Sequence, residues 1–116
     1  MSTPEPQLQE AVQHPTKLAV AAFLSGCAEA EFQAVRDRLH LTDSTLSRTV
    51  SALEDAGFVD VRRGHVGKRS RVWIALSREG RRRLAAHLAA LQQIAQQAAD
   101  LGAEDRGPVL GSAPGN

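Results

Sequence analysis

The chain has 116 residues, of which 42% are hydrophobic, and a formal net charge of +1. A chain of this length can bury one modest core, so we expect a single domain and no large enzyme cleft. No apolar run approaches the roughly 20 residues that span a bilayer, and residues 1–10 lack the basic start and apolar core of a signal peptide. We therefore expect a cytoplasmic protein with no membrane partner.

The sequence offers little to hold a metal or to carry out redox chemistry. Cys27 is the only cysteine, so no disulfide can form within the chain. None of the four histidines lies four residues from another histidine or from the cysteine, a spacing that would suggest a zinc site. We expect no metal and no cofactor, and we interpret Cys27 as a small buried apolar residue in preference to a redox sensor.

The N-terminal residues 1–13 contain two prolines and several glutamines, and they offer only Leu8 and Val12 for burial. This composition predicts a mobile tail with at most a short helix.

A buried helix is predicted after this tail, followed by a short amphipathic one. Pro15 suits the first position of a helix, and the run KLAVAAFL at 17–24 is apolar almost all round, which predicts a buried helix that ends near Ser25. Over 27–40, apolar residues recur at spacings of three and four. This pattern predicts a second helix whose apolar stripe is Phe32, Val35 and Leu39.

The segment from Leu41 to Gly57 predicts a third helix with both ends marked. Thr42 or Asp43 can accept hydrogen bonds from amide groups of the first turn, and Gly57 suits a left-handed C-cap. One face of this helix is apolar and carries Leu46, Val50 and Leu53. The opposite face is polar and carries Ser44, Arg48, Ser51 and Asp55.

The polar face of this third helix suits a DNA major groove. Short hydroxyl side chains allow close approach, and an arginine can bind guanine through two hydrogen bonds. Two short helices joined by a tight turn form a helix-turn-helix, whose second helix reads the bases. The residues expected in the groove are Ser44, Thr45, Ser47 and Arg48. Taken alone, the helix fits a solvated surface better, so its flanks decide the interpretation.

After residue 57 the apolar period changes from 3.6 to 2, which predicts a hairpin of two strands at 58–63 and 71–76. The residues on one face are Val59 and Val61 in the first strand and Val72, Ile74 and Leu76 in the second. Trp73 is expected to pack against the hairpin or the closing helix. Basic residues at the tip and on the stems can follow a phosphate backbone or enter a minor groove. They are Arg62, Arg63, Lys68, Arg69 and Arg71.

Basic residues are concentrated between Arg62 and Arg83, where nine of them stand against Glu79 alone, a local charge of +8. Such a block on a nearly neutral chain suggests a surface that faces a polyanion, with a solvated basic face as the alternative. For the arginine run at 81–83 two interpretations stay open, contact with DNA phosphates or a solvated collar.

A final helix is predicted over 78–101, capped by Ser77 and roughly 36 Å long. Its apolar residues repeat at spacings of four and three, as in a coiled coil. Because it is too long to be covered by so small a domain, we expect it to meet a second subunit; packing along the first helix is the alternative. The expected dimer interface is Leu84, Leu88, Leu91, Ile94, Ala95, Ala98 and Leu101. The Gly, Pro, Ser and Asp content of residues 102–116 predicts a disordered tail.

The order of these elements resembles the winged helix-turn-helix fold of bacterial regulators in the MarR and ArsR group. The chain is most similar to short MarR-like regulators over 41–84, through the motif L-S-R-x-x-x-x-L-E-x-A-G-[FY]-V that begins at Leu46. The resemblance implies a mainly α fold with a small β-hairpin (α+β), a winged-helix DNA-binding domain at 14–101 and a dimerisation helix at 78–101. It also implies that the four groove residues face bases and phosphates, and that the wing includes Lys68, Arg69 and Arg71.

The chain departs from this group in two ways. It lacks the paired cysteines of metal-sensing ArsR members, which argues against metal sensing. It is also shorter than is usual for a MarR protein, so no ligand cleft is implied and any small-molecule effector is unknown.

These patterns favour a transcriptional regulator over an enzyme. The chain has no tyrosine, no phosphate-binding glycine loop that opens a helix, and no nucleophile with a local His and acid signature. The hypothesis is a homodimer that binds double-stranded DNA at an inverted-repeat operator. The alternative is a winged-helix module for protein–protein interaction without specific DNA binding; the +8 block favours DNA.

Overall fold

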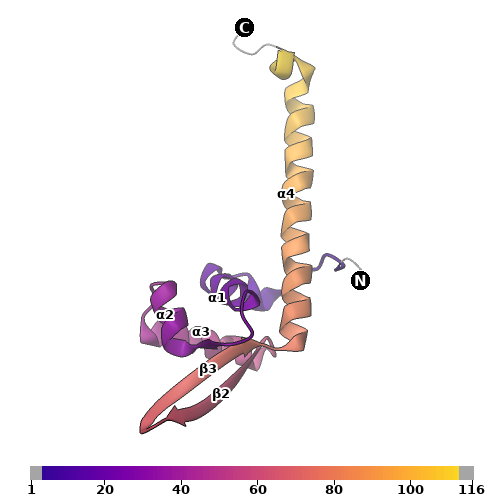
Figure 1. Cartoon of the computed structure of the whole chain (residues 1–116). Helices are drawn as coiled ribbons and strands as arrows, with labels where there is room; N and C mark the ends of the chain where they lie inside the picture. The colour runs from indigo at the N-terminus through magenta and orange to yellow at the C-terminus, as the bar shows by residue number, and fades with distance from the viewer. Residues whose placement is uncertain (1–3, 113–116) are drawn as a thin grey trace.

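The structure is a computed structural model that describes residues 4–112 and the side chains of residues 4–105. Helices dominate, with one small sheet at the edge of the domain (Figure 1). In chain order the elements are η1 (Glu10–Val12), α1 (Pro15–Ser25), β1 (Ala30–Glu31), α2 (Phe32–Arg38), α3 (Asp43–Asp55), β2 (Val59–Val66), β3 (Arg69–Leu76) and α4 (Arg78–Ser112). The predicted fold class, a mainly α fold with a small β-hairpin and a long C-terminal helix, is confirmed.

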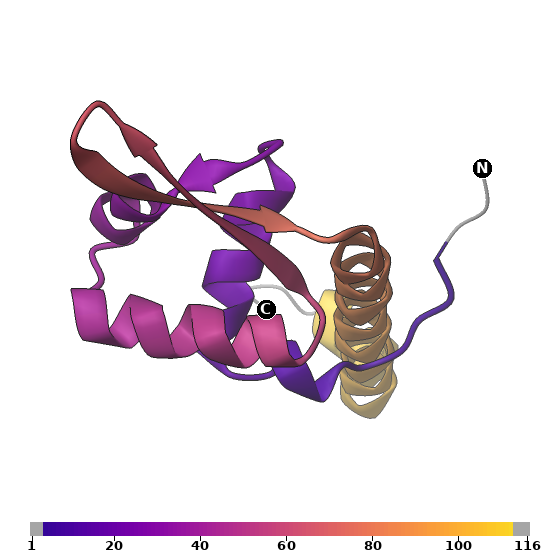
Figure 2. The ribbon, with the colours of Figure 1, turned by 90° about the horizontal axis from the view of Figure 1, so that it is seen from below.

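The apolar stripes predicted from the sequence meet in one core. Leu46 and Leu53 of α3 are fully buried, together with Leu24 of α1 and Ile74 of β3. Figure 2 shows α1, α3 and the hairpin gathered on one side of α4, which is viewed nearly along its axis. Burial of the apolar stripe leaves the opposite side of α3 facing solvent, which is the side that the sequence assigns to DNA.

The hairpin of β2 and β3 is antiparallel, and its register pairs Val59 with Leu76 and Val61 with Ile74. Directly paired residues share a face, so the predicted apolar face is confirmed. Gly67 has a φ of 64° and starts a two-residue turn with Lys68. A positive φ at only the first central position is typical of a type II′ turn, whose twist matches that of the two strands.

A third strand, β1, was not predicted. Ala30 pairs with Ile74 and Glu31 with Trp73, which gives the strand order β1-β3-β2. The second helix is therefore shorter than the predicted segment 27–40, because its first residues form a sheet edge and α2 begins at Phe32. Two residues cannot display an alternating period, so the sequence pattern did not reveal this strand.

Residues 1–13 were predicted to form a mobile tail with at most a short helix; the structure has the short helix η1, and the described part of this segment contacts the domain. The amide of Gln7 donates to the Ala86 carbonyl at 3.0 Å, the amide of Gln9 donates to His87 Nδ1 at 2.9 Å, and Val12 is fully buried. We call residues 7–13 the N-terminal strap, because they run across the base of α4. Residues 1–3 lie outside the described part of the chain.

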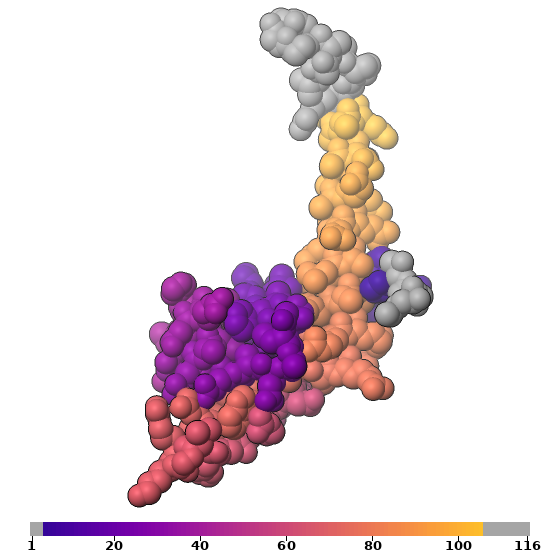
Figure 3. Space-filling model, viewed as in Figure 1, coloured from indigo at the N-terminus to yellow at the C-terminus, as the bar shows by residue number. Residues whose placement is uncertain are grey.

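α4 is longer than predicted and projects from the domain (Figures 1 and 3). It has 35 residues, about 52 Å of helix, and the Cα radius of gyration is 19.2 Å, against about 13 Å for a compact chain of this size. α4 continues past the predicted end at Leu101 and is helical as far as Ser112, over part of the segment predicted to be disordered from residue 102. A helical Gly102 costs about 1 kcal/mol relative to alanine, and the neighbouring alanines and Glu104 are good helix formers. Residues 113–116 are outside the described range.

Over the residues that the structure describes, none of the helices combines the length and the apolar character needed to cross a bilayer.

Candidate nucleic-acid interface

Local hydrogen bonds fix both ends of α3. At the start, Thr42 Oγ1 accepts a hydrogen bond from the Thr45 amide at 3.1 Å, which confirms the predicted cap. At the end, Gly57 has a φ of 79°, its amide donates to the Glu54 carbonyl at 2.9 Å, and the Phe58 amide donates to the Leu53 carbonyl at 2.8 Å. This pair of bonds is the Schellman arrangement, so the C-cap predicted at Gly57 is also confirmed.

The turn between α2 and α3 contains a residue in an unusual conformation. His40 has a φ of 56°, the one non-glycine residue with a positive φ among the described residues. The Leu41 amide donates back to the Arg36 carbonyl at 2.9 Å. The Arg36 guanidinium binds Asp37 at 2.9 Å and Asp43 at 2.8 Å, and these hydrogen bonds raise the pKa of Arg36 above its usual range. The same side chain thus joins α2 to the first turn of α3.

The outer face of α3 carries the side chains that the sequence assigned to a DNA groove. Ser44, Ser47 and Arg48 are exposed, and Thr45 is half-buried. Thr49 lies on the inner side, where its hydroxyl donates to the Thr45 carbonyl at 2.8 Å. Within residues 4–105, no ion pair involves Arg48. A free arginine beside small hydroxyls can donate hydrogen bonds to base edges.

The five predicted wing cations fall into two groups, and three of them are exposed without a carboxylate partner among the described residues. Arg63, Lys68 and Arg69 are exposed, and no carboxylate pairs with them in the described part of the chain. Figure 3 shows the wing projecting from the domain, away from the free part of α4. These three cations are therefore free to contact an external anion.

The other two wing arginines pair with carboxylates of the same chain, Arg62 at the surface and Arg71 partly buried. Arg62 pairs with Glu29 at 2.7 Å, and its guanidinium lies 4.2 Å from the centre of the Trp73 ring. Arg71 pairs with Glu31, and its side chain is only 20% exposed. Trp73 packs within the hairpin, one of its two predicted positions. Because Glu29 and Glu31 neutralise two of the charges, the wing is less basic than the sequence suggests.

A hollow of about 240 Å³ separates the start of α1 from the middle of α3. His14 closes the N-terminal end of α1, where its Nδ1 accepts a hydrogen bond from the Thr16 amide at 3.1 Å. Lys17 and Arg48 both line this hollow, so the ammonium group and the guanidinium lie on the same side of the domain. The residues that line the hollow are His14, Thr16, Lys17, Thr45, Arg48 and Thr49. Lys17 was not among the residues predicted to bind DNA, because its helix was interpreted only as core.

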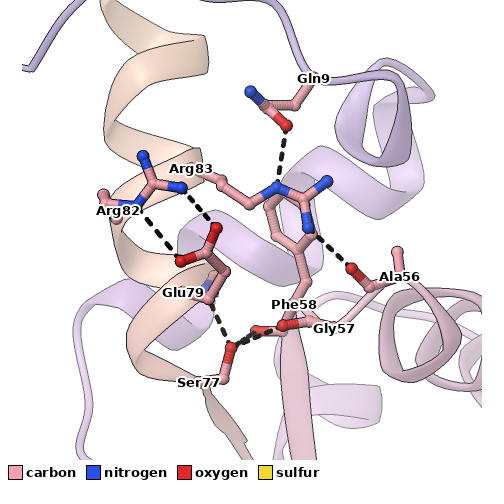
Figure 4. A network of polar contacts seen from close by, with 9 residues as sticks. Gln9, Ala56, Gly57, Phe58, Ser77, Glu79, Arg82 and Arg83 are labelled. Carbon is pink, nitrogen blue, oxygen red and sulfur yellow. Dashed lines mark hydrogen bonds and ion pairs between the residues drawn. The ribbon is translucent and has the colours of Figure 1, made fainter.

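In two of its three positions, the arginine run at 81–83 binds backbone carbonyls of its own chain. Arg81 donates to the carbonyls of Ser25, at 3.4 Å, and Cys27, at 2.8 Å, just at the end of α1. Arg83 donates to the Ala56 carbonyl at the end of α3, at 2.7 Å (Figure 4). Both arginines thus satisfy carbonyl groups that a helix end leaves free.

Arg82, the third arginine of the run, points to the surface and pairs with Glu79 (Figure 4). The hydrogen bond from Arg82 lowers the pKa of the Glu79 carboxyl.

The predicted dimer residues divide between core and surface. Leu84 is 2% exposed and belongs to the core, so it is not available to a second subunit. The others lie on the exposed part of α4, and they are Leu88, Leu91, Ile94, Ala95, Ala98 and Leu101. A groove of about 420 Å³ opens beside this stripe, between α4, α1 and the strap; it is lined by Leu8, Gln13, Pro15, Leu18, His87, Leu91 and Ile94.

Cys27 is half-buried, and its thiol donates to the Phe23 carbonyl at 3.4 Å. Over the described residues, no three side chains of the His, Cys, Asp and Glu types come together as a metal site.

A helix-turn-helix with a free polar recognition face, followed by a hairpin with free cations at its tip, defines a winged helix-turn-helix protein. Comparison with known sequences agrees with this class, because a family model described as a winged helix DNA-binding domain matches residues 16–95. The chain belongs to this family.

Individual relatives and solved structures agree with the assignment. An uncharacterized protein of Methanocaldococcus jannaschii is 29% identical over 65 residues, which cover 56% of this chain and 71% of that protein. A transcriptional regulator homologue from Pyrococcus horikoshii OT3 superposes with a TM-score of 0.72 at 21% identity, over 78% of this chain and 89% of that one. The structure of reduced AbfR bound to DNA gives a TM-score of 0.63 at 20% identity, over 72% of this chain and 61% of that one. The resemblance to MarR-like regulators is therefore confirmed at the level of the fold.

Proposed function

We propose that this protein is a sequence-specific DNA-binding transcriptional regulator that acts as a homodimer on an inverted-repeat operator. The observation that carries the proposal is a set of four exposed cations without carboxylate partners among the described residues, placed on the recognition helix and the wing. They are Arg48, Arg63, Lys68 and Arg69. A protein surface that keeps such cations free beside small hydroxyl groups suits a polyanion whose bases must be approached closely.

The two elements have different roles in this proposal. α3 enters a major groove, where Ser44, Thr45 and Ser47 approach the bases and backbone and Arg48 binds a guanine edge. Arg63, Lys68 and Arg69 of the wing hold phosphates and supply most of the affinity. Lys17, across the hollow from Arg48, adds one further phosphate contact. The structure of AbfR bound to DNA supports the proposal, because it gives a DNA-bound protein of the same fold.

The homodimer is proposed from the shape and surface of α4. Its projecting part exposes large apolar residues on one stripe, which a soluble monomer rarely leaves open to water. They are Leu88, Leu91, Ile94 and Leu101, between 38% and 66% exposed. A second copy on this stripe would bury them and would relate two recognition helices by a two-fold axis. Such symmetry gives an operator with half-sites about 34 Å apart.

The experiment begins with selection of bound fragments from a random DNA pool, followed by titration of the selected duplex and a random duplex over a range of salt concentrations. Arg48→Ala should lose about 1–3 kcal/mol on the selected duplex and relax the preference at one base position. Lys68→Ala should weaken binding to every duplex and reduce the salt slope by about 1. Arg82→Ala is the control, because it removes a surface arginine that is already paired with Glu79.

Two outcomes would contradict the proposal. If the wild-type chain binds no duplex even at low salt, the interaction module without DNA binding becomes the better explanation. If Arg48→Ala leaves both affinities unchanged, the assignment of α3 to base reading is wrong.

A further inference from the structure

We propose that Arg83 is a positioning residue: it holds the C-terminal end of the recognition helix α3 to the base of α4, and Gln9 of the N-terminal strap keeps it in place. The inference deepens the proposed function and rests on it, because it concerns how α3 is presented to DNA. Arg83 itself touches no DNA in this proposal.

The guanidinium of Arg83 contacts three residues, Ala56, Gln9 and Phe58 (Figure 4). Nη1 donates to the Ala56 carbonyl at 2.7 Å, and Ala56 is the C-cap residue of α3. Nε donates to Gln9 Oε1 at 2.9 Å, and the guanidinium lies 4.4 Å from the centre of the Phe58 ring. A cation at a helix C-terminus is favoured by the helix dipole as well as by the hydrogen bond. Three partners on two different elements fix the guanidinium in a single orientation.

The neighbouring contacts make this end of α3 a rigid joint. Ser77, just before α4, donates its hydroxyl to the Gly57 carbonyl at 2.7 Å and to the Phe58 carbonyl at 3.2 Å, and its amide also donates to Phe58 at 2.9 Å. These bonds anchor the chain after the helix, whereas Arg83 binds the helix cap itself. The direction in which α3 leaves this joint therefore depends on Arg83.

The strap supplies the third side of the site. Gln9 is 9% exposed. Its backbone amide donates to Nδ1 of His87, which lies one turn along α4 from Arg83, at 2.9 Å. The backbone of Gln9 is thus tied to α4, while its side chain holds Arg83. This explains why a polar residue of the N-terminal segment is buried: it orients the arginine that caps α3.

Arg81 provides a matched control within the same helix. Like Arg83, Arg81 extends from the first turns of α4 and donates to backbone carbonyls at the end of another helix. Its acceptors are the carbonyls of Ser25 and Cys27, at the end of α1. Arg81 has no hydrogen bond to α3 among the described residues. Loss of either arginine removes one charge and one set of capping bonds, so the two changes differ mainly in which helix is released.

The test compares Arg83→Gln, Arg83→Lys, Gln9→Ala and Arg81→Gln. The first measurement is the ratio of affinities for the selected and random duplexes, and the second is the urea midpoint of unfolding. Arg83→Gln should reduce the affinity ratio at least tenfold. Arg83→Lys, which keeps the charge and one donor, should restore part of it, and Gln9→Ala should change it in the same direction by less. Arg81→Gln should lower the urea midpoint and leave the ratio within twofold of wild type.

If Arg83→Gln lowers the urea midpoint but keeps the wild-type affinity ratio, Arg83 only stabilises the fold and the inference is wrong.

A measurement without DNA keeps the inference testable if the protein proves not to bind DNA at all. Spin labels at Ser51→Cys on α3 and Gln97→Cys on α4, in a Cys27→Ala chain diluted with unlabelled protein, report the distance between the two helices. The distance distribution should broaden or shift in Arg83→Gln and stay unchanged in Arg81→Gln. An unchanged distribution in Arg83→Gln would overturn the positioning role, independently of the proposed function.

Discussion

Gly80→Ala should destabilise the protein strongly, although alanine is the better helix former. Gly80 lies in the first turn of α4, and a Cβ added there would be 2.0 Å from the Phe58 carbonyl oxygen and 2.8 Å from its carbon. Both atoms are backbone, so no side-chain rotation can relieve the contact. To reach even 3.0 Å, the start of α4 must move about 1 Å away from the chain after α3.

The size of the effect follows from what this movement breaks. Two hydrogen bonds of Ser77 cross the contact: its one hydroxyl hydrogen is shared between the Gly57 and Phe58 carbonyls, and its amide donates to the Phe58 carbonyl. Each bond is worth about 1 kcal/mol. Overpacking adds about 1–3 kcal/mol, and the helix preference of alanine returns about 1 kcal/mol. The net loss is about 2–4 kcal/mol, a large part of the roughly 5–15 kcal/mol that holds a domain together.

Urea unfolding followed by far-ultraviolet circular dichroism measures this loss. Gly102→Ala is the control in the same helix, since its Cβ would meet no atom within 4 Å; it should gain up to about 1 kcal/mol of local helix stability. If Gly80→Ala is as stable as wild type, α4 does not approach Phe58 as closely as described, and the account of this joint is refuted.

Three further predictions concern separate parts of the chain. His40→Gly should raise the free energy of unfolding by about 0.5–1 kcal/mol in urea titrations, because it removes the strain of a side chain at a φ of 56°; a decrease would show that the imidazole makes a compensating contact. Burial lowers the pKa of His87, so the unfolded chain binds more protons just below its usual pKa of about 6.5. The free energy of unfolding should therefore fall as the pH drops from 7.5 to 5.5, and His87→Gln should reduce this pH dependence. Ile94→Glu should shift sedimentation toward the monomer while Gln93→Glu does not; equal behaviour of the two would argue against the apolar stripe as the dimer surface.

Much of the fold could be predicted because its signals are local. Thr42 and Gly57 mark the ends of α3 within the sequence that they cap, and the period-2 pattern gives the hairpin its apolar face. The exposed face of α3 follows from the same periodicity that buries Leu46. The contacts that were not predicted are long-range in sequence. Gln9 forms hydrogen bonds with His87, 78 positions along the chain, and with Arg83, 74 positions along the chain.

The candidate site was predicted less completely, because a charge count does not show which charges are paired. Arg62 and Arg71 are neutralised by Glu29 and Glu31, two residues that the sequence pattern placed on a helix and not beside the wing. Lys17 was interpreted only as part of a core helix, although it borders the hollow next to Arg48.

The long helix also acts as a lever. α4 is bound to its own domain at the base, and its far end stands clear of the other elements (Figure 1). A tilt of about 5° at the base displaces the end of a helix of this length by about 4–5 Å. If two chains join through their distal halves, the angle at the base sets how far apart the two wings lie. Substitutions near Gly80 and Arg83 should then change the preferred spacing between operator half-sites, even though neither residue reaches the DNA.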